Sequence, residues 1–249
     1  VGLNLNTDVA DLVTLSSDTD VNVRKAVAAN PNLPRETMIA MSIDDDASVR
    51  AEVASDTNID EEFAALLVSL CSNRKGDADM QVLHALGKNP NVSVDDCFDL
   101  ERPTHRKILA RHSKVPHTLR TLAGMEDDDL LLSVATNKFT PADVLSSLAG
   151  SAKTIVRIIV AENTTTPPSL LEQLSSDTNE DVRQRVAENE HAPAAVLETL
   201  ANDDSCRELA AYNTNTPPHV LDILSKDEDE EVRSAVAMNK STPAHILEA

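Results

Sequence analysis

The chain has 249 residues, of which 41% are hydrophobic, and its 42 acidic against 22 basic side chains give a formal net charge of −20. An acidic surface repels a phosphate backbone, so the composition disfavours nucleic-acid binding. The chain has no apolar run near the roughly 18 residues that cross a bilayer, and its three cysteines (Cys71, Cys97 and Cys206) fit neither a disulfide framework nor a metal motif, so we expect a cytoplasmic protein without membrane contact.

One phrase recurs along the chain. Val-Arg-Lys-Ala-Val-Ala-Ala-Asn at 23–30 returns in related form at 156–163, 182–189 and 232–239, with weaker copies between them. The positions equivalent to the final Asn are 30, 56, 89, 112, 137, 163, 189, 213 and 239, and they are spaced by 26, 33, 23, 25, 26, 26, 24 and 26 residues. This period predicts an all-α fold, an α-solenoid of about nine two-helix units of about 26 residues.

Irregularities divide the array. We expect residues 1–249 to form a single helical repeat domain that begins with a truncated first unit at 1–22, where Leu12 and Leu15 belong to a second helix. An insertion at 72–79 lengthens the period and is equally consistent with a functional and a tolerated loop. Irregular units then occupy 80–125, and regular units 126–249.

The first helix of each unit is short and amphipathic, with apolar residues at i, i+4 and i+5, as in Val182, Val186 and Ala187. An acidic residue precedes or opens it, where it caps the helix or interacts favourably with the helix dipole. The examples are Asp20, Asp46, Asp181 and Glu231.

The second helix follows a Thr-Pro pair in several units. We expect the threonine to cap it and the proline to take its first position, as at Thr166-Pro167. Apolar residues three, four and seven positions after the proline, such as Val144, Leu145 and Leu148, then form one buried stripe. Neither helix can bury its face alone, so each unit must stack on its neighbours.

The pattern Val-Arg-x-x-Val-Ala-x-Asn-x-x-x-Pro-x-x-x-Leu-x-x-Leu-x-x-Asp resembles the variant leucine-rich repeat proteins of bacteria over almost the whole chain. The resemblance implies a right-handed superhelix of alternating helices, in which the second helix is sometimes short or 3₁₀. Some members carry an iron–sulfur centre on an N-terminal cysteine cluster, which this sequence lacks, so we expect no cofactor. The acid-then-Val-Arg pattern is also similar to HEAT-like repeats, including those of a small class of DNA glycosylases.

Two polar ladders accompany the repeat. The arginines Arg24, Arg50, Arg157, Arg183 and Arg233 could line a groove for acidic partners, but acids near each helix start favour structural ion pairs within a unit or with its neighbour. The asparagines at the Asn positions suit the left-handed conformation that ends a helix, with the amide tying down the turn. We therefore expect both ladders to be structural.

One stretch breaks the acidic pattern. Residues 102–120 hold six bases, three histidines and no acid, so several cations could converge on a phosphate or an acidic peptide. The alternatives are charge compensation of the acids at 126–129 and a solvated helix face. This candidate anion or partner patch comprises Arg102, His105, Arg106, Lys107, Arg111, His112, Lys114, His117 and Arg120.

Metal sites are not expected. The histidines of the patch are seven and five residues apart, and no Cys or carboxylate lies within residues 102–120 to complete a zinc site. Asp-rich turns such as 44–46 and 127–129 lack the central Gly and distal Glu of a calcium loop and suit helix starts. Cys71 and Cys97 fall on apolar stripes, where we expect them to pack rather than react.

These features predict a non-enzymatic scaffold that presents one long face to a protein or peptide partner, with the 102–120 patch as its specialised part. The rival is a HEAT-like DNA-binding or DNA-glycosylase-like protein, which needs a basic concave face and stacking aromatic residues. The net charge of −20 and the absence of tryptophan disfavour that rival.

Overall fold

A computed structural model of the chain describes residues 4–72, 78–125 and 127–248. Over these residues the protein is all-α, with 19 helices and no strand, as the repeat pattern predicts. The chain divides into two compact units, Val1–Thr118 and Leu119–Ala249. The prediction of a single domain over 1–249 stays a prediction.

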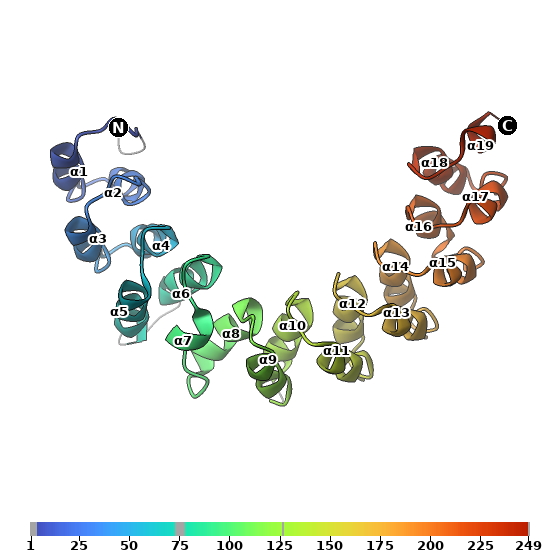
Figure 1. Cartoon of the computed structure of the whole chain (residues 1–249), viewed down its shortest axis with the longest axis horizontal. Helices are drawn as coiled ribbons and strands as arrows, with labels where there is room; N and C mark the ends of the chain where they lie inside the picture. The colour runs from blue at the N-terminus through green and yellow to red at the C-terminus, as the bar shows by residue number, and fades with distance from the viewer. Residues whose placement is uncertain (1–3, 73–77, 126, 249) are drawn as a thin grey trace. The chain divides into compact units, whose positions relative to one another are not determined.

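Short helices joined by tight turns make up both units (Figure 1). The first unit contains α1 (Val9–Leu15), α2 (Val21–Ala28), α3 (Arg35–Met41), α4 (Ala47–Ser55), α5 (Glu61–Ser72), α6 (Ala78–Lys88), α7 (Val94–Cys97) and α8 (Pro103–His112). The second contains α10 (Asp128–Thr136), α11 (Ala142–Ala149), α12 (Thr154–Glu162), α13 (Pro168–Leu174), α14 (Glu180–Glu188), α15 (Ala194–Leu200), α16 (Arg207–Tyr212), α17 (Pro218–Leu224), α18 (Glu230–Met238) and α19 (Ala244–Leu247). Helix α9 (Pro116–Ala123) spans the division.

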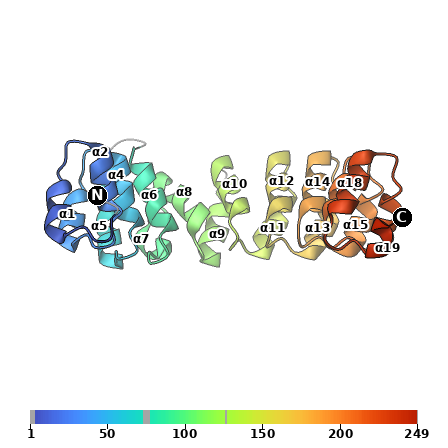
Figure 2. The same cartoon turned by 90° about the horizontal axis from the view of Figure 1, so that it is seen from above.

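Within each unit the even-numbered helices form one layer and the odd-numbered helices the other (Figure 1). Each even helix packs against the next even helix and against an odd helix beside it, as α12 packs against α14 and α13. Figure 2 shows α12 and α14 side by side in the second view as well. This stacking is the α-solenoid arrangement, in which every helix pair is stabilised by its neighbours.

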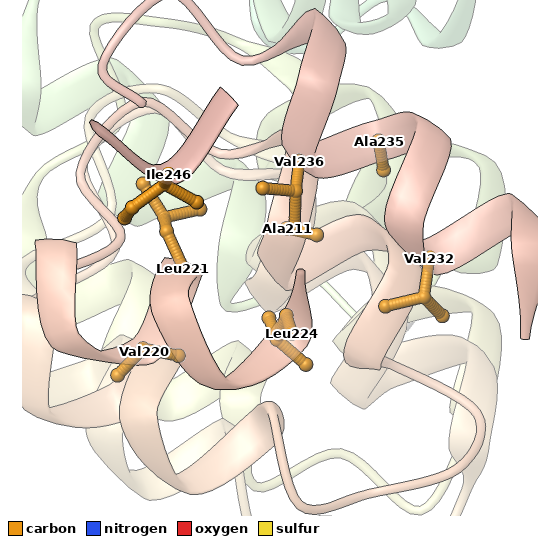
Figure 3. Close-up of a cluster of buried hydrophobic side chains, with 8 residues drawn as sticks. All are labelled: Ala211, Val220, Leu221, Leu224, Val232, Ala235, Val236 and Ile246. Carbon is orange, nitrogen blue, oxygen red and sulfur yellow. The ribbon is translucent and has the colours of Figure 1, made fainter. Parts of the chain in front are cut away.

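The core consists of small aliphatic residues at the predicted positions. Val182, Val186 and Ala187 of the first-helix pattern are completely buried, and Val144, Leu145 and Leu148 of the second are nearly so. Burying a leucine side chain stabilises the fold by about 1.5–3 kcal/mol. Near the end of the chain the two patterns meet in one cluster (Figure 3), formed by Ala211, Val220, Leu221, Leu224, Val232, Ala235, Val236 and Ile246.

The acidic residues at the helix starts have both predicted roles. Asp20 and Asp46 cap α2 and α4, because each carboxylate accepts a backbone N–H of the first turn. In α14 the cap is Asn179 and Asp181 lies in the first turn, and α18 repeats this arrangement with Asp229 and Glu231. Capping therefore accounts for the acids that open these helices.

The Thr-Pro pairs act differently from the prediction. The Thr166 hydroxyl donates to the carbonyl of Val160, 2.6 Å away, and Pro167 occupies the cap position of α13 without a side-chain cap. The threonine therefore serves the end of the preceding helix, where carbonyl groups lack partners within the helix. The same bond, six residues back, is made by Thr140, Thr216 and Thr242.

Further predictions concern the second helix of each repeat, the handedness of the superhelix and the irregular region. The second helices are α-helical over the described residues, not 3₁₀, although α7 has only four residues. The handedness of the superhelix stays a prediction. Residues 73–77 of the 72–79 insertion lie outside the described residues, so its role also stays a prediction. Among the helices described, none is long and apolar enough to cross a membrane.

Candidate functional site

The asparagine ladder joins consecutive repeats. Asn163 ends α12, and its buried amide donates to the carbonyls of Ala135 (2.6 Å) and Asn137 (3.1 Å) in the preceding repeat. Its side-chain oxygen accepts the N–H of Thr165 at 2.9 Å. The backbone is extended, with φ −66° and ψ 121°, so the expected left-handed conformation is wrong. The same double donation is made by Asn89, Asn189, Asn213 and Asn239.

The arginine ladder also joins neighbours. Arg157 makes two hydrogen bonds to Asp177 of the next repeat, at 2.7 and 2.9 Å, and a third to the carbonyl of Ser151 at 2.9 Å. The bond from Arg157 is the main cause that lowers the pKa of Asp177. In the following repeat the bond from Arg183 lowers the pKa of Asp203 to about 2. Arg24 likewise pairs with Asp44, so ion pairs between neighbouring repeats are confirmed at three of the five ladder positions. Arg50 and Arg233 donate to backbone carbonyls five and six residues back.

Arg106 belongs to this ladder and not to a surface patch. Its Nε donates to the carbonyl of Leu100 at 2.5 Å, six residues back, as Arg157 does to Ser151. The repeat register predicts this position, because Arg106 lies six residues before position 112 just as Arg157 lies six residues before Asn163. The prediction that Arg106 belongs to the surface patch is therefore wrong.

Two histidines of the patch also face the interior. His105 is 3% exposed, its Nδ1 accepts the N–H of Asp99 at 3.0 Å, and its ring meets the edge of Phe98 with centroids 5.2 Å apart. His112 is partly buried and meets His84 at 5.9 Å, and burial is the main cause that lowers its pKa to about 4. Both rings therefore pack between helices, contrary to the prediction that they belong to a surface patch.

The remaining members of the patch are exposed and are divided between the two units. Arg120 lies in the second unit, where it makes a two-bond ion pair with Asp143 at 2.8 and 3.0 Å. Arg102 lies 3.9 Å from Asp99 at the start of α8. The other exposed members, all in the first unit, are Lys107, Arg111, Lys114 and His117.

A smaller group of cations lies on α6 and α8, which pack against each other. Lys107 and Arg111 are four residues apart on the exposed side of α8, and Lys88 ends α6. Burial lowers the pKa of His84, and the charges of Arg111 and Lys88 lower it further. We call His84, Lys88, Lys107 and Arg111 the α6–α8 cationic face.

Sequence reasoning missed half of this face because it followed a continuous stretch. Lys88 immediately precedes Asn89 as Arg111 immediately precedes His112, so the two occupy the same place in consecutive repeats. Residues one repeat apart are neighbours in a solenoid. The repeat register therefore pairs Lys88 with Arg111, although 23 positions separate them.

The joint between α6 and α8 has an unusual packing pair. Position 112 carries His where most repeats carry Asn, and position 87 carries Gly where the others carry Ala, as at Ala135 before Asn163. A Cβ at Gly87 would lie 2.5 Å from Cδ2 of His112 and 3.0 Å from Cγ2 of Ile108. The imidazole thus occupies the space that alanine takes elsewhere.

One position per repeat combines regular placement with changing chemistry. It is the residue before each Asn position, at the end of an even-numbered helix, and it is exposed in every case but the partly exposed Ala29. Tyr212 and Met238 are 44% and 65% exposed there, and the tyrosine hydroxyl lies 3.2 Å from the methionine sulfur. The set is Ala29, Ser55, Lys88 and Arg111 in the first unit and Thr136, Glu162, Glu188, Tyr212 and Met238 in the second.

Within the described residues we find no group of three or more His, Cys, Asp or Glu side chains that could hold a metal ion. None of the three cysteines forms a disulfide bond: Cys71 and Cys206 are buried, as a packing role requires, whereas Cys97 is only partly buried. Burial raises the pKa of both Cys97 and Cys206, which disfavours the thiolate.

No protein-family model matches the chain, and a search of curated proteins finds no match. Among solved structures it is similar to a leucine-rich repeat variant with a novel repetitive structural motif (TM-score 0.46, 19% identity, covering 91% of this chain and 79% of that one). It is also similar to the Escherichia coli protein YibA (TM-score 0.41, 15% identity, 95% and 93% covered) and to an engineered protein (TM-score 0.35, 16% identity, 97% and 80% covered). All three TM-scores are below 0.5, and the helical-repeat architecture of this chain rests on its own helices and their packing.

Proposed function

We propose that this chain is a non-enzymatic helical-repeat scaffold that binds a protein or peptide partner. The binding surface is the exposed side of its even-numbered helices, which carries the residue before each Asn position. The observation that carries the proposal is the division of each repeat into two kinds of position. Side chains at the Asn position, and at the arginine position six residues earlier, make hydrogen bonds inside the stack. The residue just before the Asn position is exposed and changes its chemistry from repeat to repeat.

This division suits recognition because stacked helices present one such residue per repeat at regular intervals. An extended partner that lies along a stack meets these side chains in succession, and their chemistry sets its preference. In the first unit they become basic at Lys88 and Arg111, and in the second they pass from Glu162 and Glu188 to Tyr212 and Met238. Tyrosine and methionine are enriched at protein interfaces.

The DNA-binding alternative receives less support from the same surface. Binding to single strands or flipped bases uses a basic groove lined with stacking aromatic residues. The exposed set includes one aromatic residue, Tyr212. Its two cationic residues are matched in number by two glutamates, so the set is not basic as a whole. We therefore place nucleic acid among the outcomes of the test.

The test is site-specific photo-crosslinking in a lysate of the source organism. A photo-reactive residue replaces Ser55 or Glu188 on the even-numbered helices, or exposed Ala65 or Gln173 on the odd-numbered helices as matched controls. We expect the same protein to be captured from the even-helix positions and not from the controls. Equal capture from both layers, capture of nucleic acid alone or no capture from the even layer would each contradict the proposal.

A further inference from the structure

We infer that the exposed side of α10 and α12 docks a short segment of a partner protein that carries both aliphatic and basic side chains. The inference rests on the proposed function, because both helices are even-numbered, and it identifies the chemistry of the partner. The site is an aliphatic patch formed by Leu132 of α10 and by Ile155, Ile158 and Ile159 of α12. Both helices belong to the second unit.

The first step is the unusual composition of α12. Ile155 lies eight residues before Asn163 and is 51% exposed. Ile158 and Ile159 follow three and four positions later, on the same side of the helix, and both are partly exposed. The place of Ile155 is polar in every other repeat, where it holds Asn22, Ser48, Gln81, Thr104, Asp129, Asp181, Ser205 and Glu231.

The fold itself does not require these isoleucines. The core residues of α12 are at the i, i+4 and i+5 positions of the first-helix pattern, namely Val156, Val160 and Ala161. Helix α14 stacks on α12 in the same way, yet at the places of the three isoleucines it carries Asp181, Gln184 and Arg185. Stacking therefore accepts polar side chains at these places, and the isoleucines need another explanation.

The second step is the extension of the patch to the neighbouring helix. Leu132 of α10 stands 26 residues before Ile158 and is partly exposed. Helices α10 and α12 pack against each other, and the Asn163 amide donates to the carbonyl of Asn137, also 26 residues back, at 3.1 Å. This register makes Leu132 and Ile158 neighbours. Single apolar residues are common on protein surfaces, whereas a contiguous group of them marks an interaction site.

The third step is the charge around the patch. Residues 119–249 carry 23 acidic and 10 basic side chains. On α12 the exposed Glu162 lies one turn beyond Ile158. Glu162 and Glu188 share one guanidinium, that of Arg185, at 3.0 and 2.6 Å, so the two carboxylates keep a net negative charge. The patch is therefore bordered by negative charge, which a basic segment complements.

The fourth step selects the occupant. A second copy of this chain has the same net charge of −20, so the two acidic surfaces oppose association. Nucleic acids and anionic membranes are repelled for the same reason. A partner segment with aliphatic side chains for the isoleucines, and with lysine or arginine for the carboxylates, suits both features of the site.

The experiment measures fluorescence anisotropy of a short labelled leucine–lysine peptide titrated with the full chain. We expect Ile155→Gln to weaken binding by about threefold to tenfold, because the half-exposed isoleucine loses its apolar contact with the peptide. The matched control is Ile223→Gln, since Ile223 is 67% exposed on the odd-numbered helix α17. This control should change binding by less than about twofold. Glutamine forms helices well, and circular dichroism checks that both variants keep their helices.

Two control peptides separate the two features of the site. A serine–lysine peptide keeps the positive charge and lacks the aliphatic side chains, whereas a leucine–glutamate peptide keeps the aliphatic side chains and reverses the charge. We expect each to bind at least about tenfold more weakly than the leucine–lysine peptide.

Four outcomes would overturn the inference. They are an unchanged affinity in Ile155→Gln, an equal loss in Ile223→Gln, equal binding of either control peptide, and a wild-type dimer that Ile155→Gln converts to monomer in light scattering. If the even-helix crosslinks persist while the peptide does not bind, the aliphatic and basic partner is wrong and the scaffold function stands. If the peptide binds with the expected losses but the even-helix positions capture no protein, the patch keeps its ligand chemistry and the proposed function is contradicted.

Discussion

Replacing Gly87 with alanine tests the packing of the α6–α8 joint. The new Cβ would lie 2.5 Å from Cδ2 and 3.0 Å from Cγ of His112, and 3.0 Å from Cγ2 of the fully buried Ile108. Ordinary contacts between carbon atoms are about 3.5–4.0 Å, so the imidazole must move by about 1 Å. The same imidazole also packs against the ring of His84 of α6, with ring centroids 5.9 Å apart.

Two opposing effects set the magnitude. Overpacking of a filled site costs about 1–3 kcal/mol. Alanine instead of glycine in a helix contributes about 0.5–1 kcal/mol, and Gly87 lies in the last turn of α6, where the lower value applies. We therefore expect Gly87→Ala to lower the free energy of unfolding by about 1–2 kcal/mol.

The sign should reverse when His112 is replaced by asparagine. Ala135 and Asn163 show that alanine and asparagine coexist at these two positions, with the amide donating to the alanine carbonyl at 2.6 Å. In a His112→Asn background, Gly87→Ala should stabilise the chain by about 0.5 kcal/mol. Urea unfolding of the four proteins, followed by circular dichroism, gives the coupling energy, and hydrogen exchange localises it to α6 and α8. Equal effects of Gly87→Ala in both backgrounds would refute the steric argument.

Three further predictions concern the ladders and the same histidine. Asn189→Ala removes two donations to the carbonyls of the preceding repeat, so urea unfolding should show a loss of about 2–4 kcal/mol. Asp56→Asn supplies an amide where a carboxylate cannot donate and should stabilise the chain by about 1 kcal/mol. The pKa of His112 is about 4 in the folded chain, below the usual 6.5, so the unfolded chain takes up the proton first and stability falls as pH drops from 6.5 to 4. Protonation of His112 should lower the free energy of unfolding by about 1–2 kcal/mol after solvent screening. This contribution should be absent in His112→Asn.

Each of these predictions has a clear contrary result. Asn215→Ala is the control for Asn189, because exposed Asn215 also donates to a carbonyl of the preceding repeat, and an equal loss in both would show that burial is unimportant. A destabilised Asp56→Asn would mean that the carboxylate has a role that an amide cannot fill. Parallel pH profiles of the wild type and His112→Asn would show that His112 protonates equally in both states.

Local and periodic features of the sequence determined much of the fold. Apolar spacing identified both helices of each repeat, because a helix returns to the same side every 3.6 residues. The buried positions Val182, Val186 and Ala187 follow from that period alone. Acids at helix starts were predictable because a cap bonds only to the next turn of its own helix.

Contacts between repeats were decided by the tertiary structure. Which carbonyl Asn163 or Thr166 reaches depends on how one repeat is placed on another, so their predicted backbone conformation and capping role were wrong. The same holds for the candidate site: closeness in sequence grouped His105 and Arg106 with surface cations, whereas packing turned both inward. Packing also brought Lys88 beside Arg111, since stacking makes residues one repeat apart neighbours while residues adjacent in sequence point to different sides of a helix.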